Sequence, residues 1–243
     1  QLAASAPPQP RVPVGQRAVS AAFLRAFSTR AIGLLSPYQL VNGVDGHPPS
    51  IKSHSVSTGL SLVETLMLAA QVTGDCTFIQ DADGAPYFGS TSVFVSYGWN
   101  GTQIGQLKEA IESDDCGRKL YYWIDIFAVA QNGESSTQRA NNSADVASFR
   151  QVVQTASATA LFWSPIDCPA VLGRIWCLYE ILETHKASKD LRLLLRPSDR
   201  DSLIQAVGSD DGRAVRFSLE AMSSINACAA FEEDWCRIHI QIE

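Results

Sequence analysis

The sequence lacks the features that mark several classes of protein. Its six cysteines are scattered, with no C-x-x-C pair and no histidine at the spacing of a zinc site. In a chain of 243 residues with 46% hydrophobic content, such cysteines are expected to be reduced core thiols, which indicates an intracellular, cytoplasmic protein. The longest uncharged run of note, residues 151–166, is shorter than the roughly 20 apolar residues of a membrane-spanning helix. We therefore expect neither a metal site nor a membrane span.

Positive charge is scarce over most of the chain. Residues 1–54 carry five basic groups against one acid, but the remainder carries 14 against 24, and the whole chain has a net charge of −6. A body with this balance lacks the positive field that attracts phosphates, so no nucleic-acid partner is expected. The chain begins at Gln1 without an initiator Met, and we expect a processed chain or a segment of a longer protein.

The first 90 residues show little of the pattern of an α/β core. Residues 1–17 are rich in Pro, Ala and Gln and too poor in large apolar groups to form a core alone. In residues 18–27 apolar side chains recur at helical spacing. The sequence therefore predicts that residues 1–54 are an extended N-terminal arm with one short helix, for which an organelle transit peptide is the alternative. Residues 55–90 are expected to hold a helix and a β-hairpin that turns at Asp81–Gly84, preceding the core.

From residue 91 onward, short apolar runs typical of strands alternate with runs typical of helices. The expected strands are Ser92–Tyr97, Lys119–Asp125, Ala158–Trp163 and Leu191–Leu195. The expected helices are Gln103–Ser113, Asp145–Ala156, Arg174–Lys186 and Ser198–Val207. Such short, continuously apolar strands are buried on both faces, as in a parallel sheet wrapped by helices. We predict that residues 91–243 form one α/β domain: a doubly wound, flavodoxin-like parallel sheet of four to five strands, the fifth near Arg216–Met222, with helices on both faces.

Three motifs at the expected strand ends carry a resemblance to a known family. They are Val93-Phe94-Val95-Ser96-Tyr97, Trp123-Ile124-Asp125 and Trp176-Cys177-Leu178-Tyr179-Glu180. In this order they resemble the first strand, the second strand and the Trp-Cys-Leu-Asp-Glu segment of Toll/interleukin-1 receptor (TIR) domains, those of plants in particular. Fungal HET domains, which are related to TIR domains, have segments similar to Trp123-Ile124-Asp125…Gln131 and to Arg174…Glu180. The resemblance covers residues 91–207 and implies a TIR-like intracellular domain.

The resemblance also implies an activity. Some plant TIR domains hydrolyse NAD+, and their catalytic Glu corresponds to Glu180. Cleavage of the nicotinamide–ribose bond passes through an oxocarbenium-like state, which needs a carboxylate near the ribose and an enclosing surface. Because ligands of an open parallel sheet bind at the carboxyl ends of its strands, we expect Glu180 to face a cleft there. The groups expected to contact NAD+, as a substrate rather than a resident cofactor, are Tyr97, Gly98, Trp99, Asp125, Phe127 and Trp176.

Several features of the loops favour or weaken this substrate. The backbone of Gly98, Gly101 and Gly105 could approach a diphosphate, although their spacing is not the G-x-G-x-x-G of a Rossmann cofactor site. The loop after the first strand lacks the Arg common in plant TIR domains, and residues 165–169 are an insertion. These departures concern substrate binding more than the fold.

Other interpretations of the same residues stay open. Trp176 could be a core anchor and Glu180 an exposed acid that pairs with Lys186. Asp125 could orient the loop that follows it, and Cys177 is expected to be a packed thiol because no His lies nearby. The domain would then be a non-catalytic module that binds protein partners or is built into a larger assembly. The enzyme, by contrast, is expected to act only when domains associate. For both hypotheses we expect self-association or protein partners through the loop after Asp125 and the N-terminal arm.

Overall fold

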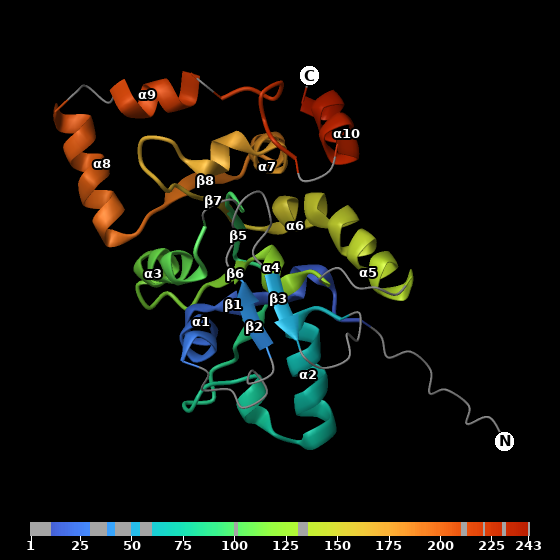
Figure 1. Cartoon of the computed structure of the whole chain (residues 1–243). Coiled ribbons are helices and arrows are strands. Elements are labelled where there is room, and N and C mark those ends of the chain that lie inside the picture. The colour runs from blue at the N-terminus through green and yellow to red at the C-terminus, as the bar shows by residue number, and fades with distance from the viewer. Residues whose placement is uncertain are drawn as a thin grey trace.

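The structure is a computed structural model of the whole chain (Figure 1). It describes residues 11–29, 38–41, 50–53, 60–99, 102–130, 136–209, 213–220, 222–229 and 232–242. Within these residues, helices and strands alternate along most of the chain and build one main sheet.

The main sheet has six strands in the order β4-β1-β6-β5-β7-β8. Their bounds are β1 (Ala18–Ser20), β4 (Phe88–Gly89), β5 (Val93–Ser96), β6 (Tyr121–Trp123), β7 (Ala158–Phe162) and β8 (Asp190–Leu194). Strands β6, β5, β7 and β8 are parallel, whereas β1 is antiparallel to β4 and β6. Numbered along the chain, the parallel strands have the order 2-1-3-4, which is flavodoxin-like. The predicted α/β class is confirmed, but the sheet is mixed rather than wholly parallel.

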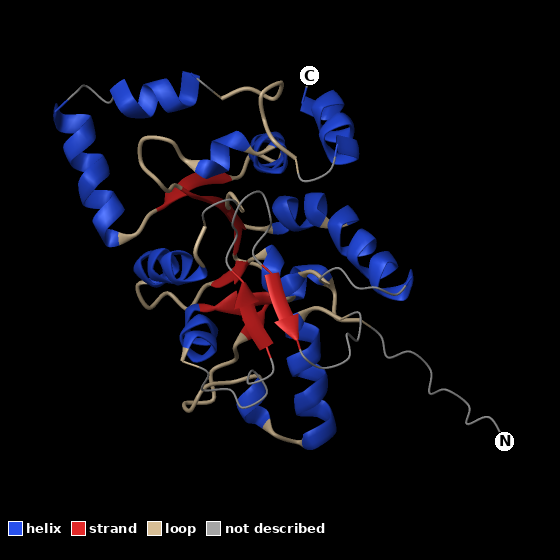
Figure 2. Ribbon diagram, viewed as in Figure 1, coloured by secondary structure: helices blue, strands red, loops and turns tan. Residues whose placement is uncertain are grey.

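Helices cover both faces of the sheet, as the ribbon shows (Figure 2). Val93 and Val95 of β5 pack in the core cluster that contains α1 and α3 side chains. Phe94 points to the other face and packs with Phe149 of α6. Because alternate residues of a strand face opposite sides, β5 is buried on both. The bounds of the covering helices are α1 (Ala21–Ser28), α3 (Ile104–Asp115), α6 (Phe149–Thr155) and α7 (Ile175–Lys186).

The remaining elements surround this centre. They are η1 (Val14–Gln16), α2 (Leu62–Thr73), η3 (Cys76–Phe78), α4 (Asp125–Ala128), α5 (Ser136–Ala147), η4 (Ala170–Gly173), α8 (Pro197–Ser209), α9 (Arg213–Glu220), α10 (Glu232–Ile242) and a two-stranded sheet of β2 (Tyr38–Val41) and β3 (Ser50–Ser53). The fifth parallel strand predicted near Arg216–Met222 is wrong, because α9 forms there. Charged residues recur at 213, 216 and 220, which is a helical spacing and not the alternation of a strand.

Residues 18–20 of the N-terminal segment form a strand of the main sheet, so the prediction that residues 1–54 form an arm outside the domain is wrong for this stretch, whereas β2 and β3 form a separate two-stranded sheet. Strand β1 lies between β4 and β6, where Val19 pairs with both Phe88 and Tyr122. The predicted short helix is present as α1, and the Ser20 side chain caps it. A strand of three residues carries no alternation signal, and its partners are far along the chain, so local pattern cannot show this pairing.

Residues 55–90 likewise do not merely precede the core. Leu62, Val63 and Leu66 of α2 are buried in the main core cluster, and β4 is an edge strand of the main sheet. The predicted turn at Asp81–Gly84 is present, between residues 80 and 86 that form an isolated antiparallel bridge. The division of the chain into an arm, a preceding unit and a core therefore fails, because all three contribute to one sheet.

Four charged residues attach the N-terminal segment to the domain, and we call Arg11, Arg17, Glu64 and Asp145 the ion-pair cluster. Three of them are buried, and Arg11 is partly exposed. Arg11 Nη2 lies 2.8 Å from Glu64 Oε2 and 2.9 Å from Asp145 Oδ2. Arg17 lies 3.2 Å from Glu64 Oε1 through Nη2 and 3.0 Å from Asp145 Oδ2 through Nη1. Burial alone would raise the pKa of Glu64, but hydrogen bonds from Arg11 and Ser61 and the charge of Arg17 hold this pKa below its ordinary value. Two guanidinium groups thus neutralise two carboxylates.

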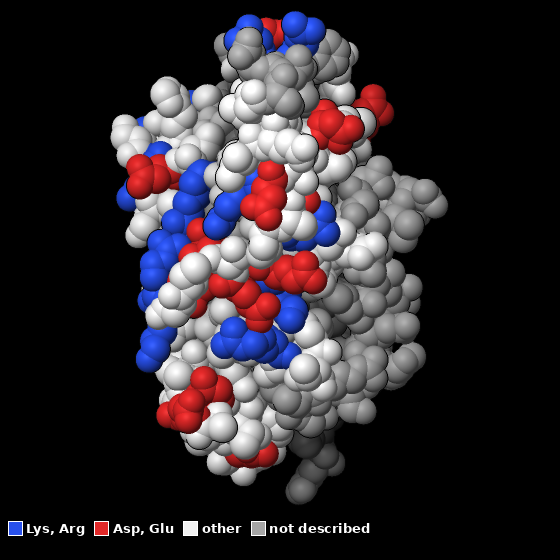
Figure 3. Space-filling model, turned by 90° about the vertical axis from the view of Figure 1, so that its left-hand side faces the viewer, with Lys and Arg blue, Asp and Glu red and all other residues white. Residues whose placement is uncertain are grey.

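The face formed by α1, α3 and α8 is strongly charged but of mixed sign (Figure 3). Arg192 lies 2.7 Å from Asp114, and Arg25 lies 3.4 Å from Glu112. Pairs of this kind spread basic and acidic groups over the same surface. In the described part of the chain, no helix combines the length and the apolar character needed to cross a membrane.

Candidate functional site

Polar groups converge at the carboxyl edge of the parallel strands. Strand β5 has β6 on one side and β7 on the other, and the helices that follow β5 and β7, α3 and α7, lie on opposite faces of the sheet. Such a topological switch point is where open α/β sheets bind ligands. We call the residues gathered there the edge cluster: Ser96, Tyr97, Trp99, Asp125, Arg174, Cys177 and Glu180.

Glu180 lies on the helix after the third parallel strand, as predicted, and its carboxyl group is buried against the sheet. Ser96 Oγ, at the end of β5, donates a hydrogen bond of 2.5 Å to Glu180 Oε2. One turn further along α7, the hydroxyl oxygens of Thr184 and Thr159 are 2.7 Å apart, so α7 is attached to both β5 and β7. Only 7% of Glu180 is exposed. Burial raises the pKa of Glu180 from 4.5 to about 8, although the Ser96 hydrogen bond and the charge of Arg174 act in the opposite direction.

Asp125 supplies a second carboxyl group at the start of α4. Its Oδ1 accepts hydrogen bonds from the Tyr97 hydroxyl and from the Ile126 N–H, and its Oδ2 accepts the Trp99 indole N–H at 3.1 Å. Burial raises the pKa of Asp125, against the lowering effects of the Tyr97 hydrogen bond and the Arg174 charge. Burial and the Asp125 charge in turn raise the pKa of Tyr97 well above its ordinary value. The Asp125 carboxyl is therefore held by three donors in one orientation.

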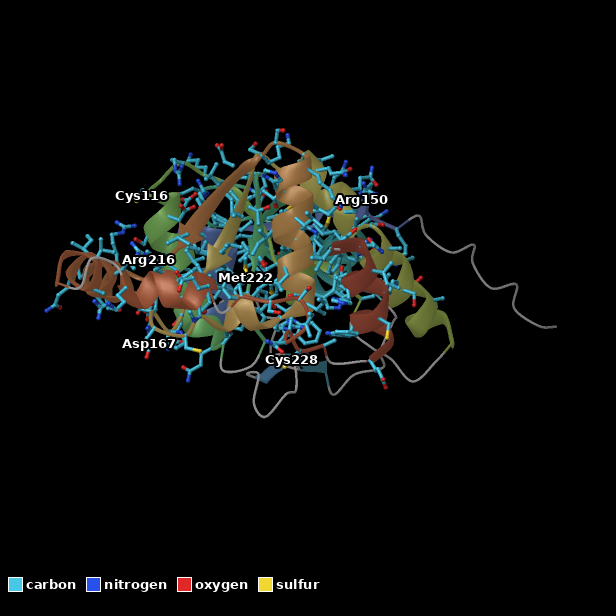
Figure 4. All side chains as sticks on the ribbon, turned by 90° about the horizontal axis from the view of Figure 1, so that it is seen from above. Cys116, Arg150, Asp167, Arg216, Met222 and Cys228 are labelled. Atoms are coloured by element: carbon cyan, nitrogen blue, oxygen red, sulfur yellow. The ribbon has the colours of Figure 1, made fainter. Side chains whose placement is uncertain are left out.

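Arg174 covers the cluster from the start of α7. The centre of its guanidinium group lies 3.8 Å from the centroid of the Trp99 ring, a cation–π distance. The backbone at Arg174 forms an isolated parallel bridge with Cys228. In Figure 4, Cys228 and Arg150 lie toward opposite ends of α7, and the end near Cys228 is the one that meets the edge cluster. The C-terminal part of the chain thus helps to position Arg174.

Cys177 is a packed thiol, as predicted. Its sulfur lies 3.4 Å from the carbonyl oxygen of Tyr97, and burial raises the pKa of the thiol to about 12. A thiol with such a pKa is a poor nucleophile. All six cysteines are free, but the prediction that they lie in the core is correct for Cys177 alone, because the others are exposed: Cys76, Cys116, Cys168, Cys228 and Cys236.

Two aromatic residues predicted to contact NAD+ lie outside the edge cluster. Phe127 is fully buried and packs edge-on against Phe23 and Phe27, with ring centroids 5.5 and 5.2 Å away. Trp176 precedes Glu180 by one helical turn, but its ring packs on Phe149 of α6 at 5.7 Å. Both rings therefore serve the packing of helices and do not line a site with Glu180.

The alternative reading of α7 is half correct. Trp176 is a packing anchor, as that alternative held. Glu180, however, is not an exposed acid paired with Lys186, because Lys186 Nζ lies 3.2 Å from Glu183 instead. Glu183 is also buried and bonds to Arg150 at 2.7 Å, so the two glutamates of α7 have different surroundings.

Gly98 is required for packing. A Cβ atom at this position would lie 2.6 Å from the Cβ of Ala170 in η4, so the segment after β7 closes directly over the end of β5. The Gly98 backbone is therefore covered on this side and not presented to a phosphate. Gly101, the second glycine of the predicted phosphate contact, and Gln131, of the HET-like motif, lie outside the described residues.

Sequence reasoning quoted Ser96 and Arg174 in motifs but did not assign either of them to the site. Ser96 is the one hydroxyl residue of β5, at its carboxyl end. A polar side chain in a strand buried on both faces needs a hydrogen-bond partner, and from this requirement Ser96 could have been assigned to the site. No comparable local signal exists for Arg174, because its contact with Trp99 depends on how α7 approaches the sheet.

Among the described residues, no group of three potential ligands from His, Cys, Asp and Glu is placed to hold a metal ion. Comparison of the chain with protein-family models, with curated proteins and with solved structures gives no match.

Proposed function

We propose that the protein hydrolyses the nicotinamide–ribose bond of NAD+ at the carboxyl edge of its sheet, as a TIR-like domain that is active when copies associate. The single observation that carries the proposal is the buried Glu180 carboxyl, bonded to Ser96 at the topological switch point. A carboxyl group with a strongly perturbed pKa in such a place is a candidate for a functional residue. The resemblance of residues 174–180 to the catalytic segment of TIR domains supports the same assignment.

The reaction would use the ionised form of Glu180. The bond between ribose C1 and the nicotinamide nitrogen breaks, its electron pair leaves with neutral nicotinamide, and water adds to C1 to give ADP-ribose and a proton. A carboxylate beside the ribose stabilises the positive charge that develops there. The cationic nicotinamide ring of the bound substrate would itself lower the pKa of Glu180 and favour loss of its proton.

Nicotinamide release by the purified chain tests this proposal, with and without a crowding agent that promotes association. We expect Glu180→Gln to abolish release, and Glu183→Gln, one turn along α7, to retain it. Because the free protein must lose the Glu180 proton, kcat/KM should rise with pH with an apparent pKa of about 8. Absence of release under all conditions, or equal release by Glu180→Gln, would refute the activity.

A non-catalytic interaction module is the second candidate, and exposed apolar side chains favour it. Strand β8 is an edge of the main sheet, and Leu191 and Leu193 on it are 46% and 40% exposed. On α8, Ile204 and Val207 are 65% and 50% exposed and lie one turn apart. Exposed apolar groups near a free sheet edge are typical of surfaces that bind other chains.

The molar mass in solution, measured by light scattering over a range of concentrations, tests this candidate. We expect the wild-type chain to associate and the double variant Ile204→Glu/Val207→Glu to remain monomeric. Val72→Glu is the matched control, because Val72 is 74% exposed on α2, a different helix. If all three proteins have the same mass at every concentration, α8 is not an association surface.

A further inference from the structure

Trp99 is held in the edge cluster as a bound ligand would be. Its ring lies under the Arg174 guanidinium at 3.8 Å, and its N–H donates to Asp125 Oδ2 at 3.1 Å. The indole is only half-buried, although it makes both contacts. The indole thus occupies a position between two charged groups. The Arg174 guanidinium lies over its face, and the Asp125 carboxylate accepts the N–H at its edge.

The Asp125 acceptor does not depend on Trp99 for its orientation. The Tyr97 hydroxyl and the Ile126 N–H both bond to Oδ1, which leaves Oδ2 directed at the indole. If the indole left, Oδ2 would keep its position and would need another donor, because an enclosed carboxylate oxygen without a partner is costly.

The backbone that precedes Trp99 is restrained at Gly98, so we expect the indole to leave by a movement of its side chain and not by a movement of the end of β5. Gly98 is pressed against Ala170, and its carbonyl oxygen accepts a hydrogen bond from the Thr102 hydroxyl. The contacts of Trp99 with Arg174 and Asp125, by contrast, are made by its side chain. A change of its rotamer would expose both Arg174 and Asp125 Oδ2.

The charge of the two flanking groups selects the ligand. A guanidinium group attracts the π face of a neutral, electron-rich ring and repels a cationic pyridinium ring. The carboxylate oxygen at the rim requires an N–H donor on the ring edge, as in the amino group of adenine. We propose that Trp99 occupies a subsite for a neutral adenine-type base and that such a base displaces the indole. This proposal concerns the binding of a base at Trp99, which is separate from the cleavage of the nicotinamide–ribose bond proposed above.

Adenosine binding, measured by calorimetry, tests the proposal with two variants that weaken the internal occupant to different degrees. Trp99→Phe removes the N–H but leaves a ring under Arg174, whereas Trp99→Ala removes both. Because an internal occupant reduces apparent affinity by the fraction of molecules that it blocks, affinity should rise from wild type to Trp99→Phe to Trp99→Ala, by about tenfold or more overall. Adding Arg174→Met to Trp99→Ala should remove the gain.

Equal affinity of the wild type and both Trp99 variants for adenosine would overturn the proposal. So would a stronger gain for nicotinamide riboside, whose ring is cationic, than for adenosine. Either Trp99 variant alone decides the matter if the other fails to fold. Since no bond is cleaved in this experiment, it can succeed where nicotinamide release fails, and the two proposals are tested separately.

Discussion

The ion-pair cluster and the edge cluster both contain buried carboxyl groups, but the pKa shifts of these groups have opposite directions. In the ion-pair cluster two guanidinium groups face two carboxylates, and the pKa of Glu64 is lowered. In the edge cluster one guanidinium group lies near two carboxyl groups, and the pKa values of Glu180 and Asp125 are raised. Balanced charge is typical of a structural fastening, and an uncompensated carboxyl at a sheet edge is typical of a functional site.

Breaking the charge balance of the ion-pair cluster should have the largest effect on stability. Arg17→Met removes a guanidinium group that is 3% exposed and leaves Arg11 alone with two buried carboxylates. We expect the free energy of unfolding to fall by about 3 to 5 kcal/mol, measured by urea denaturation. Arg25→Met is the control: Arg25 is 56% exposed in its pair with Glu112, so a loss of at most about 0.5 kcal/mol is expected. Similar losses in the two variants would contradict the role of the cluster.

Glu180→Gln should act in the opposite direction at neutral pH and above. Because the folded-state pKa of Glu180 is raised to about 8, the folded protein retains a proton that the unfolded chain loses near pH 4.5. This contribution to stability is fully present below the unfolded pKa and is lost as the pH rises through the folded one. The variant keeps an acceptor for Ser96 but has no charge to bury. Relative to wild type, its free energy of unfolding should rise by on the order of 4 kcal/mol between about pH 5 and about pH 8, because each pH unit contributes about 1.4 kcal/mol in this range. A pH-independent difference would show that Glu180 does not titrate in this way.

Glu183→Gln sharpens the comparison within a single helix. Glu183 bonds to Arg150 at 2.7 Å and to Lys186 at 3.2 Å, and both cations are largely exposed. Loss of these pairs should cost about 1 kcal/mol at neutral pH, measured by the same urea denaturation. The two substitutions thus have opposite expected signs, although they change the same residue type three positions apart on α7. If Glu183→Gln stabilised the protein, Arg150 and Lys186 would not compensate the charge of the Glu183 carboxylate.

Much of the main sheet could be predicted because its strands are continuous apolar runs. The run Val93-Phe94-Val95 is buried on both faces, which leaves no choice but a central strand. Strand β1 could not be predicted, because three residues beside a helix carry no signal of their partners. The strand expected near Arg216–Met222 was wrong, because the alternating pattern of the chain suggested one more strand, whereas the spacing of charges at 213, 216 and 220 favoured a helix.

The site was predictable only in part, and the reason is geometric. Glu180, Asp125, Tyr97 and Trp99 follow strand ends or lie on the next helix, so strand order alone brings them together. Which face of α7 meets β5 depends on helix packing, and this turned Trp176 toward α6 while Glu180 reached Ser96. The burial of Glu180, and hence its raised pKa, could not be predicted from the sequence, because a glutamate on a helix is usually exposed to solvent.

The titration of Glu180 tests the contrast between the two clusters most directly. Carbon-13 NMR of the glutamate side-chain carboxyl groups, with Glu180→Gln used to assign the signal, gives the midpoint in the folded chain. The account predicts a midpoint near pH 8 for Glu180 and a lowered one for Glu64. A Glu180 midpoint near its ordinary value of 4.5 would contradict it, because the carboxyl would then be charged at neutral pH like that of Glu64.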